Sequence, residues 1–224
     1  MSELGRRIEL HTHSLLSDGA LTPSEIASRA QALDYETIAV TDHVDGSNLD
    51  LIAKRLAETF NDLQGSLDVT LIPGVELTHV PPDHIMGMAK RAKELGAKIV
   101  IAHGETIVEP VAPGTNKAAA SCTFVDILAH PGLVTCEEAR LAKENEVFME
   151  LNSRVGHCLA NGQVARVATE VGAKLVVGTD MHDPGELLSQ ELAFKIAIGS
   201  GLEEDTSLKV VKDYPRDLLK RLDL

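Results

Sequence analysis

The chain has 224 residues, 44% of them hydrophobic and 25% charged, which is enough to bury one sizeable core. It carries 34 Asp and Glu against 21 Lys and Arg, a formal net charge of −13, and such an acidic surface repels phosphate backbones. Stable binding to a nucleic-acid duplex is therefore disfavoured, although a bound metal cluster would still create a local positive site.

Short runs rich in Ile, Val and Leu alternate with amphipathic segments along the chain. Such near-continuous apolar runs are typical of parallel strands that are buried on both faces of a sheet. We predict strands over seven runs, in chain order 6–10, 37–40, 69–75, 98–102, 124–129, 147–151 and 174–178.

Helices are predicted in the gaps between these runs. Thr22-Pro-Ser-Glu25 has a capping-box pattern with proline at the first helical position. A helical stripe over 49–63 follows Asn48, which we expect to cap it. Thr135-Cys-Glu-Glu138 offers another capping box. Further helices are predicted over 86–95, over 159–171 and along the last forty or so residues, with Tyr214-Pro215 as a break.

Seven strand-then-helix units favour one domain over residues 1–224, because no linker rich in Pro, Ser or Gly divides them. The pattern is that of an α/β barrel or a doubly wound sheet. The segment 104–123 is the least regular, and we expect it to form an active-site loop that carries a short helix. Helices from about residue 186 onward are expected to pack on the barrel.

Each of the seven runs is followed by a polar side chain, in most cases one that can bind a metal. Because the carboxyl ends of the strands share one rim in a parallel α/β barrel, residues distant in sequence would converge there. In chain order these residues are His11, His13, Asp42, His43, Glu76, His103, His130, Asn152, Asp180 and His182.

The side-chain types in this set indicate a transition metal. Six are histidines, Glu76 and Asp180 are carboxylates at strand ends, and Asp18 adds a carboxylate in the loop after the first strand. Imidazole and carboxylate together suit zinc, iron or manganese, whereas calcium and magnesium prefer oxygen ligands alone. A single catalytic zinc takes about three or four ligands. These nine residues would therefore suffice for two or three ions if one carboxylate bridges.

The motifs that carry these residues occur in a fixed order between residue 8 and about residue 185. They are His11-Thr-His13, Asp18-Gly19, Thr41-Asp42-His43, Gly74-Val-Glu76, His103, His130-Pro131-Gly132 and Gly178-Thr-Asp180-Met-His182. This series resembles the PHP (polymerase and histidinol phosphatase) family. The resemblance implies a distorted (β/α)7 barrel with a trinuclear metal centre. Glu9 stands where the family often has Asp, and Asp42 would orient an imidazole or cap a helix.

The resemblance assigns the nine ligands to three ions. His11, His13, Glu76 and Asp180 would hold the first ion, Glu76 would bridge to a second ion with His103 and His130, and Asp18, His43 and His182 would hold the third. It also implies hydrolysis of a phosphomonoester or phosphodiester, with Asp180 and His182 in the catalytic centre. Three divalent ions outweigh three ligand carboxylates, so the pocket would attract phosphate. A metal-bound hydroxide, formed near neutral pH, would then attack phosphorus.

Side chains near the motifs are candidates for contact with the substrate. Arg154 would form a bidentate, catalytic clamp on the phosphate, or else a salt bridge at the rim. His157 would protonate the leaving alkoxide, unless it caps a helix or lies on the surface. His79 and His84 would line the pocket or be exposed. Lys117 is a weaker candidate for a phosphate contact.

Three functions remain open. The first is a phosphatase for a small phosphomonoester, with L-histidinol phosphate as the substrate that the family suggests. The second is a nucleotide phosphodiesterase or single-strand exonuclease, which an aromatic content of 3% disfavours because bases would find few rings to stack on. The third is a non-catalytic metal-binding or polymerase-accessory domain, which the complete ligand set disfavours. The oligomeric state is also open.

We expect a cytoplasmic protein that makes no contact with a membrane. No apolar run approaches the roughly 18 residues of a membrane-spanning helix, and the first ten residues lack the apolar stretch of a signal peptide. The cysteines Cys122, Cys136 and Cys158 are odd in number and widely spaced, so we expect reduced thiols.

Overall fold

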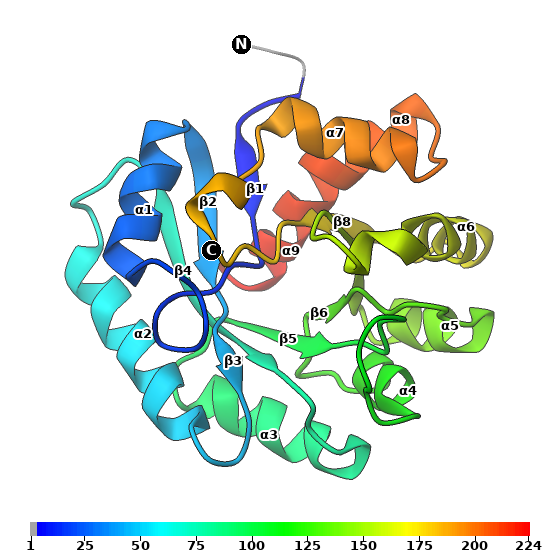
Figure 1. The fold of residues 1–224 in the computed structure, drawn as a ribbon, viewed down its shortest axis with the longest axis horizontal. Coiled ribbons are helices and arrows are strands. Elements are labelled where there is room, and N and C mark those ends of the chain that lie inside the picture. Colours follow the sequence, from blue (N-terminus) through cyan, green and yellow to red (C-terminus); the bar gives the residue numbers. More distant parts are fainter. Residues whose placement is uncertain (1–3) are drawn as a thin grey trace.

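The strands follow one another around a barrel in nearly the order of the sequence (Figure 1). The computed structural model describes residues 4–224. The strands are β1 Arg7–Glu9, β2 Tyr35–Val40, β3 His43–Val44, β4 Thr70–Leu77, β5 Ile99–His103, β6 Ile127–Ala129, β7 Phe148–Asn152 and β8 Leu175–Gly178. They pair in parallel in the order β1-β2-β4-β5-β6-β7-β8, and β3 pairs with β4.

The barrel closes where β1 and β8 meet. Just beyond their carboxyl ends, Thr12 and Met181 form a parallel bridge. The Asp180 amide donates a hydrogen bond to the His11 carbonyl at 3.0 Å. The His13 amide donates to the Met181 carbonyl at 2.8 Å. We call this junction the seam. All seven predicted runs form strands, and the expected distorted (β/α)7 barrel is confirmed, with the two-residue β3 as an addition.

Helices cover the outside of the barrel (Figure 1). They are α1 Pro23–Ala32, α2 Leu49–Leu63, α3 Pro82–Glu94, α4 Thr115–Ala120, α5 Cys136–Glu144, α6 Asn161–Val171, α7 Gln190–Gly199, α8 Glu204–Leu208 and α9 Tyr214–Arg221. Shorter helical turns are η1 His157–Ala160, η2 Pro184–Glu186 and the π-helical η3 Lys209–Asp213. The short helix expected within 104–123 is α4. None of the helices in the described part of the chain is long and apolar enough to cross a membrane.

Two helices begin at the predicted capping motifs. The Thr22 hydroxyl oxygen accepts a hydrogen bond from the Glu25 amide at 3.3 Å at the start of α1. At the start of α5, Thr135 and Glu138 form both hydrogen bonds of the capping box. These side chains satisfy amides that have no partner within the helix, which fixes where each helix starts.

The helix predicted over 49–63 has the bounds of α2, but two residues expected to mark helix ends act differently in the structure. Asn48 precedes α2 but does not cap it, because its side chain bonds the Asp45 amide at 2.9 Å and the His43 carbonyl at 3.0 Å. It thereby stabilises the turn between β3 and α2. Pro215 does not break the last helical segment, since η3 leads directly into α9. Pro215 has no amide to donate, and the Val211 carbonyl four residues before it accepts a hydrogen bond from the Gln190 side chain at 2.9 Å instead.

Buried apolar layers lie on both sides of the strands. The outer layer packs the helices on the barrel, and the inner layer fills its interior. Leu218 and Leu219 of α9 belong to the inner layer together with Ile127 of β6. In the same region, Arg221 donates to the Asp126 carboxylate, next to the amino end of β6, at 2.7 Å. The C-terminal helix therefore covers the amino end of the barrel and leaves the carboxyl end open.

Candidate metal centre

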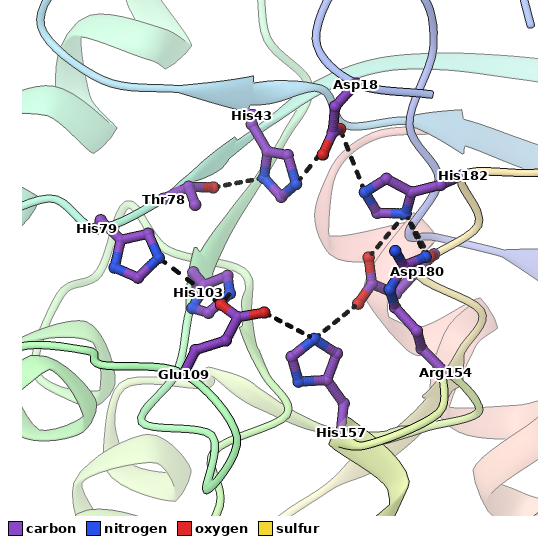
Figure 2. Close-up of a pocket in the computed structure, with 10 residues that line it drawn as sticks. All are labelled: Asp18, His43, Thr78, His79, His103, Glu109, Arg154, His157, Asp180 and His182. Atoms are coloured by element: carbon purple, nitrogen blue, oxygen red, sulfur yellow. Dashed lines mark hydrogen bonds and ion pairs between the residues drawn. The ribbon is translucent and has the colours of Figure 1, made fainter. Parts of the chain in front are cut away.

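A pocket of about 320 Å³ opens at the carboxyl ends of the strands (Figure 2). It is lined by Asp18, His43, Thr78, His79, His103, Glu109, Arg154, His157, Asp180 and His182. These side chains come from strand ends and from the loops that follow them, and Figure 2 shows them converging on one space. The convergence that the strand-end pattern predicts is therefore present.

All nine predicted metal ligands belong to clusters of possible donor atoms. In each cluster one donor atom of every member lies within 4.8 Å of the others. The clusters join His13, Asp18, His43 and His182; His11, His13 and Asp180; His11, Glu76 and His130; His103, His130 and His157; and His79, His103 and Glu109. Shared histidines link the clusters into one continuous centre. That each residue binds an ion remains a prediction.

The seam brings residues from the two ends of the barrel sequence together. His11 and His13 follow β1, Asp180 follows β8, and all three are buried. Nε2 of His13 lies 3.2 Å from an Asp180 carboxylate oxygen, and Nε2 of His11 lies 3.4 Å from Glu76. Both rings therefore present a nitrogen to the same pair of carboxylates, as residues two apart on one extended strand can do.

Several buried nitrogen and oxygen atoms that could bind a metal in this centre have no hydrogen-bond partner. Within residues 4–224 they include Nε2 of His11, both ring nitrogens of His13, Nδ1 of His130 and both carboxylate oxygens of Glu76. Glu76 has an ion-pair contact of 2.8 Å with His43. A buried polar atom without a partner costs about 1–3 kcal/mol, and an uncompensated buried charge costs more. Imidazole nitrogen and carboxylate oxygen suit zinc, iron and manganese, so these residues fit a multinuclear metal centre.

Neighbouring charges shift the pKa values of the central residues. Burial lowers the pKa of His11, but Glu150 and Glu76 outweigh it and hold that pKa well above the ordinary value. Burial lowers the pKa of His13 to about 4, and the nearby His43 adds to this effect. Burial raises the pKa of Glu76, but the charges of His11 and His43 outweigh burial and hold that pKa well below the usual value. Glu76 is therefore ionised, the form that binds cations.

Three residues of the site have a backbone conformation that L-amino acids rarely adopt. The φ angle is 52° at His79, 28° at His130 and 52° at Asp180. Such conformations cost of the order of 1–3 kcal/mol each and persist only where the surrounding structure holds them. The His130 amide is held by the Glu150 carboxylate at 3.1 Å. The strained backbone thus keeps these side chains directed toward the pocket region, as strain at functional sites often does.

Glu150 is a site residue that the strand-end pattern misses. One carboxylate oxygen lies 2.7 Å from Nδ1 of His11, and the other accepts from the His130 amide at 3.1 Å and the Asn152 side chain at 2.8 Å. Glu150 lies inside the run 147–151 rather than at its end. The signal that could have found it is a lone carboxylate in an apolar strand, which must have a partner when buried.

Two further lining residues come from positions without a motif. The Thr78 hydroxyl lies 2.6 Å from Nδ1 of His43. Glu109 of the segment 104–123 lies 3.1 Å from Nε2 of His103 and 3.4 Å from Nε2 of His157. The hydrogen bond with His103 lowers the pKa of Glu109 to about 2, although partial burial opposes it. Glu109 is therefore an anion at neutral pH, directed into the pocket.

Arg154 lies in the wall of the pocket, next to His182. Its Nη1 is 2.7 Å from Nδ1 of His182, donates to the Asp180 carbonyl at 3.2 Å and reaches the Glu186 carboxylate at 3.4 Å. The predicted salt bridge at the rim is present as the pair with Glu186, and the side chain also lines the pocket. The phosphate clamp remains a prediction.

His157 and His79 also line the pocket. His157 is buried and opens η1, so its surface alternative is wrong, and its Nδ1 lies 2.8 Å from the Thr106 hydroxyl. Burial and the neighbouring His130 lower the pKa of His157 to about 4. His79 is half exposed and lies 3.6 Å from Glu109.

Three other candidates lie outside the pocket lining. His84 is exposed on α3, and Lys117 is exposed on α4, where it pairs with Glu137 at 2.9 Å. Within residues 4–224, no hydrogen bond joins the Asp42 carboxylate to an imidazole or to the first amides of a helix. Its carboxylate accepts from the amide and the hydroxyl of Ser14 at 2.8 and 2.6 Å, so it holds the loop that follows β1.

Glu9, the departure from the family pattern, supports the seam. Its carboxylate pairs with the buried Arg7 at 2.6 Å. It also accepts hydrogen bonds from the amides of Leu10, His11 and Thr179 at 3.0, 3.0 and 3.2 Å. Glutamate at position 9 therefore holds the main chain on both sides of the seam, next to the residues that carry the metal-binding side chains.

The fold and the centre together define a metal-dependent hydrolase built on a parallel α/β barrel, since such barrels carry their reactive residues at the carboxyl-end rim. Residues 9–152 match the family model of the PHP domain. The chain belongs to the PHP domain family and is a metal-dependent hydrolase of the phosphatase type.

Sequence relatives include both uncharacterized and named proteins. An uncharacterized protein of Methanocaldococcus jannaschii is 45% identical over 217 residues, which cover 96% of this chain and 100% of that protein. A probable phosphatase of Thermoanaerobacter sp. is 26% identical over 240 residues, with 96% of each chain covered. The DNA polymerase/3'-5' exonuclease PolX of Bacillus subtilis is 28% identical over 200 residues, 81% of this chain but 35% of that protein. The chain thus spans about a third of the length of PolX.

Solved structures share the fold at low sequence identity. A chain of an archaeal ribonuclease P, determined with mature tRNA, has a TM-score of 0.72 and 16% identity over 96% of this chain and 91% of that one. The histidinol phosphate phosphatase of Lactococcus lactis, determined with zinc, L-histidinol and phosphate, has a TM-score of 0.57 and 14% identity over 97% of this chain and 94% of that one.

Proposed function

We propose that the chain hydrolyses a small phosphomonoester at a centre of two to three divalent ions. The observation that carries the proposal is the group of buried, unpartnered donor atoms on His11, His13, Glu76 and His130. Cations satisfy nitrogen lone pairs and carboxylate oxygens that converge in this way, and zinc, iron and manganese all suit the donor set.

The pocket supports a small substrate. Its volume of about 320 Å³ is at the lower end of the range of roughly 300–1,000 Å³ that is usual for small-molecule sites. Its lining consists mainly of imidazoles and carboxylates, with one guanidinium, and among the described residues that form it there is no Phe, Tyr or Trp. A nucleobase would therefore find no large ring to stack on, whereas a phosphate group would find a strongly polar surface.

The clusters in the structure support most of the ligand sets that the motifs imply, although among the described residues His103 clusters with His130 and not with Glu76. Glu76 lies between the rings of His11 and His130, at 3.4 and 3.6 Å, which suits the predicted bridge between two ions. Asp18 lies 3.6 Å from His43 and 3.2 Å from His182, as expected for a third set. Bound divalent ions supply Lewis-acid stabilisation of the phosphoryl oxygens and an activated water.

Arg154 is the side chain that we assign to the phosphate. Among the described lining residues it is the one with a guanidinium, and its side chain is 31% exposed, so substrate can reach it without disturbing the core. Arginine binds phosphate through paired N–H groups, and such charge-assisted bonds are about twice as strong as neutral ones. His157 is less suited to act as the general acid, because a pKa of about 4 leaves it neutral at pH 7.

L-histidinol phosphate is the first substrate to test. The Lactococcus lactis phosphatase, which shares the fold, was determined with L-histidinol and phosphate.

The three cysteines are unpaired, which suits the cytoplasmic location that we propose.

A second candidate is hydrolysis of nucleotides or of single-stranded nucleic acid. The likeness to PolX and to a chain of ribonuclease P favours it. The net charge of −13 and the lack of large rings in the described pocket lining count against it, because single-strand sites combine basic grooves with stacking platforms.

The test is phosphate release by purified protein loaded with zinc or manganese. The substrates are L-histidinol phosphate, a panel of other small monoesters, a nucleoside bisphosphate and a short single strand of DNA. We expect release from one or more small monoesters and none from DNA. Preference for the nucleotide or the DNA would favour the second candidate. Metal-loaded protein that is inactive on every monoester would contradict the proposal.

A further inference from the structure

The carboxylate of Glu109 reaches into the pocket from a loop that no motif marks (Figure 2). One oxygen lies 3.1 Å from Nε2 of His103 and 3.6 Å from Nε2 of His79. The other oxygen lies 3.4 Å from Nε2 of His157. Three imidazole nitrogens thus face one carboxylate, and His103 also belongs to the cluster that includes His130.

The loop that carries Glu109, residues 104–114, is anchored at its base. The Glu105 carboxylate accepts hydrogen bonds from the amides of Gly114 and Asn116, both at 2.9 Å. The Asn116 side chain in turn accepts from the Glu105 amide at 2.9 Å. Thr106 bonds the ring of His157 at 2.8 Å. Hydrogen bonds therefore hold the loop that places Glu109 at the pocket.

The tautomer of His103 shows what must lie between these groups. Nδ1 of His103 is 3.1 Å from the Gly104 carbonyl oxygen, which can only accept, so Nδ1 carries the proton. In the neutral ring Nε2 then presents a lone pair, and that lone pair faces the Glu109 carboxylate. Two acceptors at 3.1 Å repel each other unless a cation lies between or beside them. A metal ion held by Nε2 of His103 would supply that positive charge.

We propose that Glu109 is a further metal ligand, delivered by the loop 104–114 to the ion that His103 and His130 hold, and that the phosphate group of the substrate competes with it for this ion. The inference rests on the proposed function, because it requires the metal centre. The Glu109 side chain is 37% exposed, so it can leave the ion without uncovering the core. A carboxylate and a phosphate offer the same anionic oxygen ligands, and only one needs to be bound at a time.

The test compares the wild type with Glu109→Gln and Glu109→Ala, which remove the charge with and without retaining the size of the side chain. Glu144→Gln is the matched control, since Glu144 is exposed on α5 and does not line the pocket. Circular dichroism verifies the fold of each variant. Zinc affinity is measured by competition with a chromogenic chelator, and binding of inorganic phosphate is measured by calorimetry at buffered, saturating zinc.

In the Glu109 variants we expect one zinc ion to bind at least about tenfold more weakly, by analogy with the loss of other groups that support a metal site. We expect inorganic phosphate to bind at least about tenfold more tightly, because the carboxylate that competes with it for the ion is removed. Unchanged zinc affinity would overturn the assignment of Glu109 as a ligand. Weaker zinc binding with unchanged phosphate affinity would overturn the competition. Wild-type protein that binds no zinc would overturn the proposed function as well, which separates the two failures.

Discussion

Nδ1 of His11 lies 2.7 Å from a carboxylate oxygen of Glu150, and both side chains are fully buried. A carboxylate in this position fixes the ring of a metal-binding histidine and raises the basicity of its other nitrogen. In His11 that other nitrogen is Nε2, which lacks a hydrogen-bond partner and faces Glu76. Glu150 thus orients His11 through Nδ1, although Glu150 itself does not line the pocket.

Glu150→Gln is expected to weaken metal binding while the enzyme still folds. The amide keeps the size of the side chain but removes the charge that supports His11, and loss of such a partner typically costs about 10–100-fold in metal affinity. Zinc titration against a chelator measures the change, and Glu144→Gln on the surface of α5 serves as the control for charge. Equal zinc affinity in Glu150→Gln and the wild type would show that the contact is only structural.

Gly178→Ala is expected to destabilise the protein. A Cβ at position 178 would overlap the Glu150 carboxylate, whereas a Cβ at Gly185 would meet open space. Overpacking of this kind costs about 1–3 kcal/mol, which corresponds to a fall of roughly 2–12 °C in Tm for a chain of this size. Gly185→Ala is the matched control and should leave Tm unchanged. Similar Tm values for both variants would mean that Glu150 moves aside freely.

His43→Ala and Glu76→Ala are each expected to abolish hydrolysis without unfolding the chain. Each change removes a predicted ligand, and Glu76 is also the predicted bridge between two ions. Phosphate release is measured after metal reconstitution, and circular dichroism verifies the fold. Full activity of either reconstituted variant would contradict the trinuclear interpretation.

Zinc affinity is expected to fall as the pH is lowered. Burial lowers the pKa of His11, but Glu150 and Glu76 raise it to well above the ordinary value of 6.5, so His11 holds a proton in the metal-free protein near neutral pH. This proton must leave when an ion binds. Below the raised pKa, affinity should fall by up to about tenfold per pH unit for each displaced proton.

The same shift has the opposite effect on the metal-free fold. Its contribution to stability is fully present below pH 6.5, the value for an unperturbed histidine, and is lost as the pH rises through the raised pKa of His11. Zinc titrations and thermal melts of metal-free protein at pH 6, 7 and 8 measure both trends. Zinc affinity that does not depend on pH would show that His11 is already deprotonated.

Arg154→Ala is expected to raise KM for the phosphoester by about 10–100-fold, since a hydrogen bond to a charged group contributes about 1.5–3 kcal/mol. Arg154→Lys should recover only part of the loss, because lysine keeps the charge but not the paired geometry. Steady-state kinetics separate KM from kcat, and Arg166→Ala on the exposed face of α6 is the control. An unchanged KM would contradict the assignment of Arg154 to the phosphate.

The sequence predicts most of the barrel because each main strand is buried on both faces and shows this in its own apolar residues. The two-residue β3 is not predictable in this way, since His43 and Val44 form a strand only through pairing with β4. Asn48 and Pro215 illustrate a similar limit, because the structure of the neighbouring turn decides what each residue does.

The strand-end pattern predicts nine candidate ligands at one rim. It does not predict the two carboxylates that contact these ligands, Glu150 and Glu109. Glu150 lies within β7 and pairs with His11, which follows β1 and is distant in sequence. Glu109 depends on the path of an irregular loop, which its residue types do not specify. Loop conformation and contacts across the barrel are tertiary properties, so these two carboxylates become visible only in the folded chain.

The seam has a consequence for the synthesis of the protein. His11 and His13 are synthesised well before Asp180 and His182, because the strands β2 to β8 lie between them in the chain. Closure of the barrel and completion of the centre are therefore a single late event. Until then the early histidines lack their partners, so a nascent chain has no complete site for metal.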